Sequence, residues 1–185
     1  MIRWLLLLLG GALLGGIVHL ATIFSLPRTA TQDAYARLEA IAPVNRVTAL
    51  PAPAPEKAVM PFMDPAFADA ICRYDLSNGP LKLTVPVGTA YTSVSFYTRY
   101  NVAYYAINDR AAGRRAIELD LMTVEQRNEL PDEEDVTAAD RLIVESPTPT
   151  GMIAVRALAP EPGLMLVAQR AVAAARCTQS ELPNP

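Results

Sequence analysis

The chain has 185 residues, of which 51% are hydrophobic, and its formal net charge is −3 at pH 7. This slight acidity argues against a nucleic-acid-binding protein, because such a protein needs a basic surface. The length allows one folded domain of about 100–150 residues together with a terminal extension.

An uncharged apolar run opens the chain and extends from Trp4 to Leu26. A helix rises about 1.5 Å per residue, so this run can cross the hydrocarbon core of a bilayer, about 30 Å thick. It is longer than the apolar core of a cleaved signal peptide, about 7–15 residues, and no good small-x-small cleavage site follows it. We therefore interpret residues 1–27 as an uncleaved transmembrane signal-anchor helix that places the protein in a lipid bilayer.

The charges beside this helix do not favour a cytoplasmic N-terminus, since Arg3 and the amino terminus oppose Arg28, Arg37 and Arg46. A long C-terminal domain can be translocated largely regardless of such charges. The start Met-Ile-Arg-Trp is typical of an export signal-anchor. We expect the body of the protein to lie outside the cytoplasm.

One face of the anchor carries Gly11, Gly15, His19 and Thr22, which follow one another at steps of four, four and three residues. Glycines let two helices approach closely, and a polar residue on the same face can form a hydrogen bond across the contact. The face predicts a helix–helix contact with a second copy of the chain or with a partner's helix. Alternatively, the glycines are ordinary for a membrane helix, and His19 bonds only a nearby carbonyl or headgroup water.

Residues 28–57 are predicted to form a short helix followed by a proline-rich stalk. Cap-forming residues at 29–33 favour an amphipathic helix that ends near Ala42. Its apolar positions are Tyr35, Leu38 and Ile41. Alternating prolines at 51–55 indicate an extended polyproline-II spacer between the membrane and the body.

Residues 58–178 have the pattern of a β-domain, with short alternating segments separated by turn residues such as Asn78-Gly79-Pro80. The predicted strands are Ala66–Leu76, Leu81–Val85, Ser93–Thr98, Val102–Ile107 and Ala116–Leu121. This spacing predicts a mainly β fold, a jelly-roll-like β-sandwich.

The last third of the domain adds helices and a hairpin to this prediction. A capping box at Thr123 opens a short helix, and the strands 141–145 and 152–158 are predicted to pair as a hairpin. An alanine-rich C-terminal helix is predicted from Pro162 to about Cys177, and residues 179–185 are predicted to be a disordered tail.

The two cysteines, Cys72 and Cys177, allow two interpretations. In an oxidising compartment they could form one disulfide that closes most of the domain. They could equally be two separate buried thiols that act as small apolar residues.

Few residues in the body suit catalysis. Residues 27–185 contain no histidine, which removes Ser-His and Cys-His nucleophile pairs and the commonest transition-metal ligand. The cysteine spacing fits no zinc site, and no phosphate-binding glycine loop is present. We predict no catalytic residue, no metal site and no cofactor, and an enzyme based on two facing carboxylates is the weakest hypothesis.

A cluster of aromatic residues is the strongest candidate for a ligand or partner surface. It consists of Tyr91, Tyr97, Arg99, Tyr100, Tyr104 and Tyr105. Tyrosine and arginine are enriched at binding surfaces, although tyrosine is also an ordinary strand residue.

Three segments carry a resemblance to a known family. Arg73–Pro80 (RYDLSNGP), Leu81–Pro86 (LKLTVP) and Tyr91–Val94 (YTSV) resemble the core motif of the domain of unknown function 1254 family. With its anchor, the chain is similar to the short, membrane-anchored branch of that family in Gram-negative bacteria. The resemblance implies a jelly-roll-like sandwich, and longer relatives carry a second β-domain of the 1214 family.

We therefore expect a single-pass inner-membrane protein whose periplasmic β-domain binds another envelope protein, one that carries the sister 1214-family domain. The alternative is a small-ligand-binding envelope module in which the tyrosine-rich strands line the mouth of the sandwich.

Overall fold

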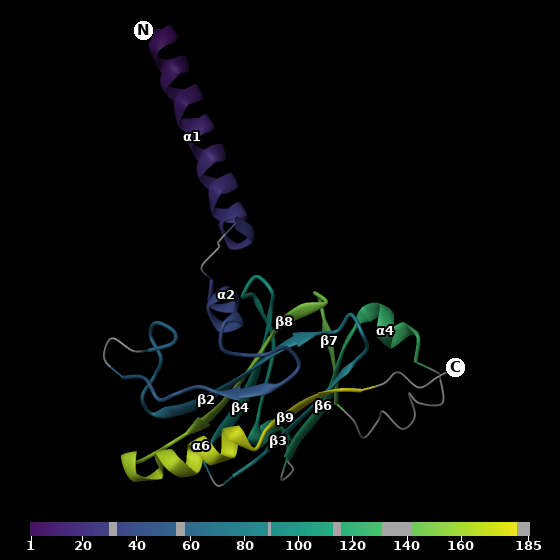
Figure 1. The fold of residues 1–185 in the computed structure, drawn as a ribbon. Coiled ribbons are helices and arrows are strands. Elements are labelled where there is room, and N and C mark those ends of the chain that lie inside the picture. Colours follow the sequence, from purple (N-terminus) through teal and green to yellow (C-terminus); the bar gives the residue numbers. More distant parts are fainter. Residues whose placement is uncertain (30–32, 55–57, 89, 113–115, 131–141, 181–185) are drawn as a thin grey trace.

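Two β-sheets pack face to face in the computed structural model, which describes residues 1–29, 33–54, 58–88, 90–112, 116–130 and 142–180 (Figure 1). The five-stranded sheet has the order β1 (Val47–Ala49), β2 (Phe67–Asp75), β8 (Thr150–Leu158), β4 (Thr92–Thr98) and β5 (Ala103–Asn108). The four-stranded sheet has the order β7 (Leu142–Ser146), β6 (Ala116–Thr123), β3 (Leu81–Pro86) and β9 (Arg176–Gln179). The helices are α1 (Ile2–Thr29), α2 (Ala34–Glu39), α3 (Asp109–Ala112), α4 (Val124–Asn128), the short 3₁₀ helix η2 (Pro162–Leu164) and α6 (Met165–Ala173).

Alternating apolar residues of both sheets fill the space between them. Val94 and Phe96 of β4 are fully buried, as the alternation in the sequence predicts, and they meet Leu83 and Leu119 of the other sheet in one core. The predicted fold class is confirmed: a mainly β sandwich with an N-terminal apolar helix and a C-terminal helix.

The predicted hairpin between residues 141–145 and 152–158 is wrong. The strand β7 runs parallel to β6 in the four-stranded sheet, whereas β8 lies between β2 and β4 in the five-stranded sheet. The turn between them therefore crosses from one sheet to the other. Ile153 and Val155 of β8 are fully buried in the main core, which favours a central place for this strand in its sheet. Residue 141 lies outside the described residues.

The C-terminal helix is shorter than predicted. The helix α6 ends at Ala173, and Arg176–Gln179 forms β9 along the edge of β3, with Cys177 opposite Leu83. This distant pairing overrides the helix propensity of the alanine-rich sequence. Residue 179, predicted as the start of the tail, ends this strand, and residues 181–185 lie outside the described residues.

The structure joins Cys72 of β2 and Cys177 of β9 in a disulfide. Both cysteines are buried, their Cα atoms are 6.5 Å apart, and 105 positions separate them in the sequence. The bond therefore links the two sheets within the core.

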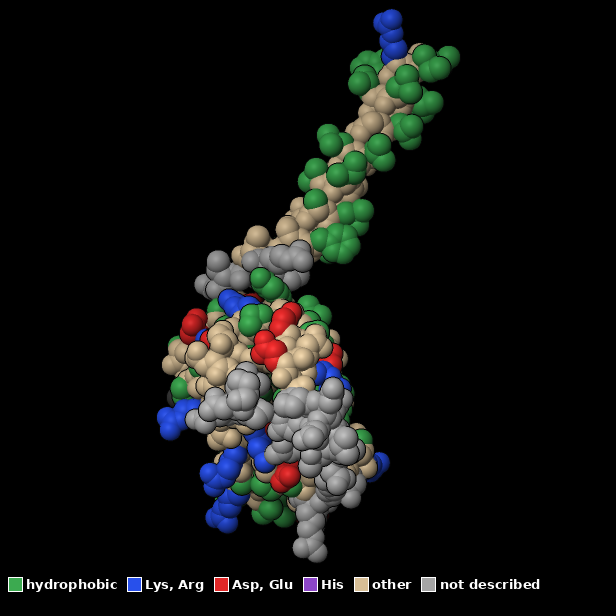
Figure 2. Space-filling model, turned by 90° about the vertical axis from the view of Figure 1, so that its right-hand side faces the viewer, with side chains coloured by type: hydrophobic (Ala, Val, Ile, Leu, Met, Phe, Trp, Pro, Cys, Tyr) green, Lys and Arg blue, Asp and Glu red, His purple; other side chains and the backbone are tan. Residues whose placement is uncertain are grey.

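The helix α1 extends away from the sandwich (Figure 1). Hydrophobic side chains cover the visible side of this helix along its length (Figure 2). Residues Ile2–Leu26 are long and apolar enough to cross a membrane, and none of this segment is buried against the rest of the chain. The helix continues to Thr29, two residues beyond the predicted end of the anchor.

Part of the segment predicted as a stalk, residues 28–57, belongs to the sandwich. The strand β1 pairs with β2, and Leu50 is buried. Of the three apolar positions predicted for the short helix, Tyr35 and Leu38 are buried on α2, whereas Ile41 is 42% exposed. The predicted capping box of α4 is confirmed, since Thr123 and Gln126 bond each other's backbone N–H groups.

Candidate functional site

The outer face of the five-stranded sheet carries a second, smaller apolar cluster. Because side chains alternate along a strand, Ile71 of β2 and Met152 of β8 point away from the main core. They are covered by Leu38 of α2 and by Leu50, which follows β1. This part of the outer face is therefore covered by other segments of the chain and is not exposed to solvent.

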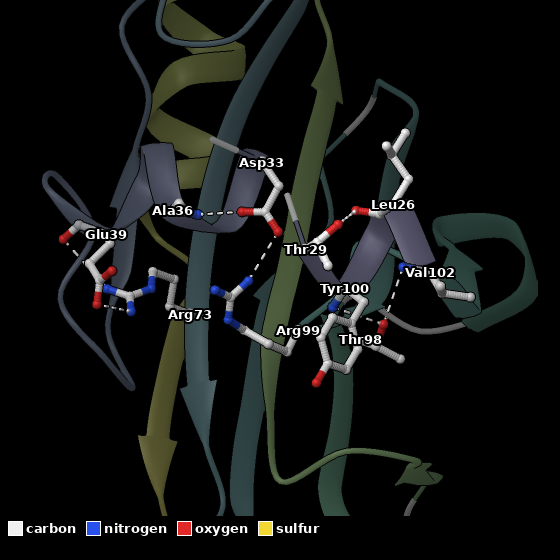
Figure 3. A network of polar contacts seen from close by, with 10 residues as sticks. All are labelled: Leu26, Thr29, Asp33, Ala36, Glu39, Arg73, Thr98, Arg99, Tyr100 and Val102. Atoms are coloured by element: carbon white, nitrogen blue, oxygen red, sulfur yellow. Dashed lines mark hydrogen bonds and ion pairs between the residues drawn. The ribbon is translucent and has the colours of Figure 1, made fainter. Parts of the chain in front are cut away.

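Two ion pairs hold α2 on this face (Figure 3). Asp33 caps the helix by accepting a hydrogen bond from Ala36 N, and its other carboxylate oxygen lies 3.0 Å from Arg99 Nη1. At the far end of the helix, Glu39 Oε1 lies 3.2 Å from the buried Arg73 Nη2.

The ring of Tyr35 lies against the same two arginines. The guanidinium carbons of Arg73 and Arg99 are 4.6 and 4.2 Å from its centroid. Ion pairs and cation–π contacts together hold α2 against the sheet.

The turn between β4 and β5 forms the neighbouring wall. Thr98 Oγ1 accepts hydrogen bonds from the N–H groups of Tyr100 and Val102, at 3.3 and 3.2 Å (Figure 3). Asn101 has a φ of 62°, a left-handed conformation that asparagine tolerates better than most residues. The turn thus holds the backbone at Asn101 in a defined conformation.

A cavity of about 340 Å³ lies between these walls and the sheet. Its lining is mostly apolar and includes three of the six methionines of the chain. The lining residues are Ala34, Leu50, Met60, Pro61, Phe62, Met63, Asp69, Ile71, Tyr97, Asn101, Met152, Ala154 and Arg156. The volume falls in the lower part of the range for small-molecule pockets, roughly 300–1,000 Å³.

An ion pair closes the end of the cavity away from Asn101. Arg156 Nε donates to Asp69 Oδ1 at 2.9 Å, and the guanidinium stacks 4.4 Å from the centroid of the Phe67 ring. Burial raises the pKa of the Asp69 carboxyl, although Arg156 opposes that change. The two charges cancel, so the cavity offers no unpaired charge at this end.

Tyr97 contributes a phenol hydroxyl to the lining residues, and Asn101 contributes an amide. The Asn101 Oδ1 atom is buried, and it has no hydrogen-bond partner among the described residues. A buried carbonyl oxygen without a donor is unfavourable by about 1–3 kcal/mol. This oxygen has practically no accessible surface, so it is not open to the cavity.

Phe62 stands at the rim of the cavity. Its side chain is fully exposed, and its φ of 61° lies in the left-handed region that glycine prefers. Both features are unfavourable for a phenylalanine, and neither is compensated by a described contact.

The tyrosine and arginine cluster predicted as one surface is divided by the structure. Tyr97 lines the cavity, Arg99 holds α2, and Tyr91 and Tyr100 are exposed. The methionines of the cavity were missed, because Met60 and Met63 lie outside any strand and no short-range pattern relates them to Met152.

The other two tyrosines of that cluster face the core. Tyr104 and Tyr105 pack beside Phe96, with ring centroids 6.1 and 5.7 Å from its own. The Tyr104 hydroxyl lies 3.1 Å from that of Tyr74, and burial raises the pKa of the Tyr104 phenol.

The predicted contact face of the anchor is exposed along α1. A Cβ added at Gly11 or Gly15 would meet nothing within 4 Å, so both positions are open for a second helix. His19 is exposed, and Thr22 Oγ1 donates to Val18 O of its own helix at 2.8 Å.

The described residues of the cavity provide few side chains for metal binding or acid–base catalysis. The described residues contain no group of three or more His, Cys, Asp or Glu placed to hold a metal ion. Among the described lining residues Asp69 is the one carboxylate, whereas the hypothesis of an enzyme based on two facing carboxylates needs a pair. The arrangement is suited to binding a mostly apolar molecule.

Comparison with known proteins gives a family and a fold. The family model "Protein of unknown function (DUF1254)" matches residues 44–179. No curated protein matches the chain.

Two solved structures are similar. The VPA0106 protein from Vibrio parahaemolyticus is 14% identical, with a TM-score of 0.62 over 88% of this chain. An uncharacterized protein from Burkholderia cenocepacia is 12% identical, with a TM-score of 0.48 over 75% of this chain. This chain spans 38% and 36% of the lengths of those two proteins.

Proposed function

We propose that this chain, which belongs to the DUF1254 family, is a membrane-tethered module that binds a small, mostly apolar ligand on the outer face of its five-stranded sheet. The observation that carries the proposal is the cavity of about 340 Å³ itself. Ligand pockets are typically concave and apolar with a few placed polar groups, and this one has that composition.

The three methionines support the same proposal. Met60, Met63 and Met152 present unbranched, polarizable side chains that can adjust to the shape of an apolar molecule. The other lining segments are α2 and the turn at Asn101, which ion pairs and backbone hydrogen bonds hold in place.

Tethering follows from α1. A 25-residue apolar segment that is exposed along its whole length in the described part of the chain is stabilised best by lipid. The Cys72–Cys177 disulfide supports an oxidising compartment for the sandwich, which in a bacterial cell is the periplasmic side of the inner membrane.

The methionines also provide the test. The full-length protein in lipid nanodiscs is oxidised with dilute peroxide, and each methionine is quantified by mass spectrometry with and without naphthalene, 1-decanol, decyl methyl ether or decanoate. We expect at least one compound to slow oxidation of Met60, Met63 and Met152 while leaving Met165 on α6 unchanged. Failure of all four to protect the three cavity methionines would overturn the proposal.

A matched pair of variants controls this test. Ala154 lines the cavity, whereas Ala106 of β5 is exposed on the same sheet, two strands away in the same row. Ala154→Trp should fill the cavity and abolish the protection, and Ala106→Trp should retain it.

A protein partner is the second candidate function. On α6, Leu166 and Val167 are 65% and 60% exposed, an apolar surface at the end of the sandwich away from α1 (Figure 1). The sister 1214-family domain remains our proposal for that partner. Leu166→Gln with Val167→Gln should then abolish co-purification of the partner from native membranes, whereas Arg170→Gln on the same helix should not.

A further inference from the structure

The turn between β4 and β5 exposes two apolar side chains. Tyr100 is 42% exposed and Val102 is 57% exposed. Thr98 Oγ1 accepts a hydrogen bond from the backbone N–H group of each of them, so the turn presents both side chains from a backbone of defined conformation. Burial of the two side chains against an apolar partner would be favourable, because their apolar surface would leave water.

An ion pair places this turn beside the start of α2. Arg99 Nη1 lies 3.0 Å from Asp33 Oδ2, and the same carboxylate caps α2. The Arg99 guanidinium carbon also lies 4.2 Å from the centroid of the Tyr35 ring on α2. The helix α2 lies on the side of the sandwich that is nearer to α1 (Figure 1). The turn therefore belongs to the end of the sandwich at which the anchor is attached.

The anchor sets how far this end can be from a bilayer. The apolar span ends at Leu26, three residues before the end of α1 at Thr29, which is a rise of about 5 Å. The headgroup layer is about 5–8 Å deep on each side of the hydrocarbon core. When α1 crosses the membrane, Thr29 therefore lies among the headgroups, and four residue steps keep Asp33 within about 14 Å of it.

The chemistry of the turn suits this neighbour. The amphipathic ring of tyrosine is enriched where headgroups meet acyl chains, and valine gains by entering the apolar side of that boundary. The acidic residues at the two ends of α2, Asp33 and Glu39, are each paired with an arginine. Neither adds an uncompensated negative charge that anionic headgroups would repel.

On the basis of the membrane tethering proposed above, we infer that the turn of residues 99–102 docks on the lipid surface and inserts Tyr100 and Val102 at the boundary of headgroups and acyl chains. The contact holds one end of the sandwich toward the bilayer, so the domain has two attachments to the membrane, the helix α1 and this turn.

The test uses tryptophan fluorescence in the full-length protein. Trp4, the one tryptophan of the chain, is replaced by phenylalanine, and a new tryptophan is introduced singly as Tyr100→Trp, Val102→Trp or Val167→Trp. Each protein is placed in nanodiscs of phosphatidylcholine with and without bromine near the headgroup end of the acyl chains. Because bromine quenches tryptophan at contact, we expect a loss of fluorescence at positions 100 and 102.

Val167→Trp is the matched control. Val167 is 60% exposed, but it lies on α6, at the end of the sandwich away from α1 (Figure 1). Its fluorescence should be the same in both kinds of nanodisc. Quenching at positions 100 and 102 that is no stronger than at position 167 would overturn the inference.

A second substitution shows whether the native turn makes the contact or the new tryptophan alone does. Added to Tyr100→Trp, the change Val102→Glu should reduce quenching, because a charge is costly among acyl chains. Leu166→Glu, at an exposed position of α6, should leave the quenching of Tyr100→Trp unchanged. Equal quenching with and without Val102→Glu would overturn the inference.

Trp4 of the unmodified protein separates this inference from the proposed tethering. Loss of Trp4 fluorescence in brominated nanodiscs reports that α1 is inserted. If Trp4 is quenched and the two turn positions are not, the docking of the turn is overturned and the tether stands. If Trp4 is not quenched, the tethering is overturned and the inference with it.

Discussion

At Phe62, the exposed aromatic ring and the left-handed backbone occur in one residue at the rim of the cavity. Each is unfavourable in the free protein, and sites of this kind are often kept for binding. The ring can cover a ligand in the cavity, which would bury its apolar surface.

Phe62→Gly should therefore separate stability from binding. Glycine tolerates a φ of 61°, so the free energy of unfolding should rise by about 1 kcal/mol. Protection of Met60 and Met63 by 1-decanol should weaken. Thermal unfolding and the oxidation assay measure the two effects, and a variant that is less stable than the parent would contradict this account of Phe62.

Asp69 predicts a pH dependence. Burial raises the pKa of Asp69 in the folded state, so the folded protein binds this proton more tightly than the unfolded chain does. The resulting stabilisation is fully present below pH 3.8, the ordinary pKa of the group, and is lost as the pH rises through the raised pKa. Between those two values, the stability of the parent should fall relative to that of Asp69→Asn. Thermal unfolding of both proteins between about pH 3.5 and 7 measures the difference, and a gap that is constant with pH would refute the assignment.

At the scale of elements, α2 connects the anchor region to the cavity through one carboxylate. Asp33 both caps the helix and pairs with Arg99, and its side chain is only 9% exposed. Since Ala34, the next residue, lines the cavity, release of α2 would open the site.

Two substitutions distinguish the roles of Asp33. Asp33→Asn should keep the cap and lose the ion pair, whereas Asp33→Ala should lose both, with the cap alone accounting for about 1 kcal/mol. Hydrogen exchange of residues 34–39 should be faster in both variants and fastest in Asp33→Ala. Equal exchange rates in the two variants would show that the cap contributes nothing.

The disulfide links elements from opposite sheets. Replacing Cys72 and Cys177 together by alanine should lower the free energy of unfolding by about 2–5 kcal/mol, since the bond closes a loop of about 100 residues. The intact mass of the protein, alkylated without reduction, checks that the bond exists. Two alkylated cysteines in protein from native membranes would contradict both the bond and the oxidising compartment.

Local patterns in the sequence predicted the elements that depend on local interactions. Alternation placed Val94 and Phe96 on one face of their strand, and the structure buries that face in the core. The capping box at Thr123 was found from two residues three positions apart. The predicted β7–β8 hairpin and the predicted helix through Cys177 were wrong because pairing with distant strands decides both. The strand β7 pairs with β6, and β9 pairs with β3. The cavity could not be predicted, since α2, residues 60–63 and the turn at Asn101 meet only in the folded chain.

At the scale of the whole molecule, the tether is short. Four residue steps separate Thr29, the end of α1, from Asp33, so the start of α2 lies within about 14 Å of that end. If α1 crosses the bilayer, the wall of the cavity formed by Ala34 lies close to the lipid surface, and an apolar ligand could reach it without a long path through water.

The anchor itself predicts self-association or a partner helix. Gly11→Ile with Gly15→Ile should abolish helix–helix contact, because two larger side chains would occupy the face that is open at both glycines. Crosslinking of the full-length protein in native membranes measures the association, with Gly10→Ile and Gly16→Ile on other parts of the helix surface as the control. Equal crosslinking in both double variants would refute the contact face.

The most direct test of the cavity is the identity of what the protein carries from its own membrane. Full-length parent, Ala154→Trp and Ala106→Trp are purified from native membranes under identical conditions, and the small molecules released from each are quantified by mass spectrometry. The account predicts one neutral apolar compound at similar amounts in the parent and Ala106→Trp and a strongly reduced amount in Ala154→Trp. Equal recovery from all three proteins, or recovery from none, would contradict it.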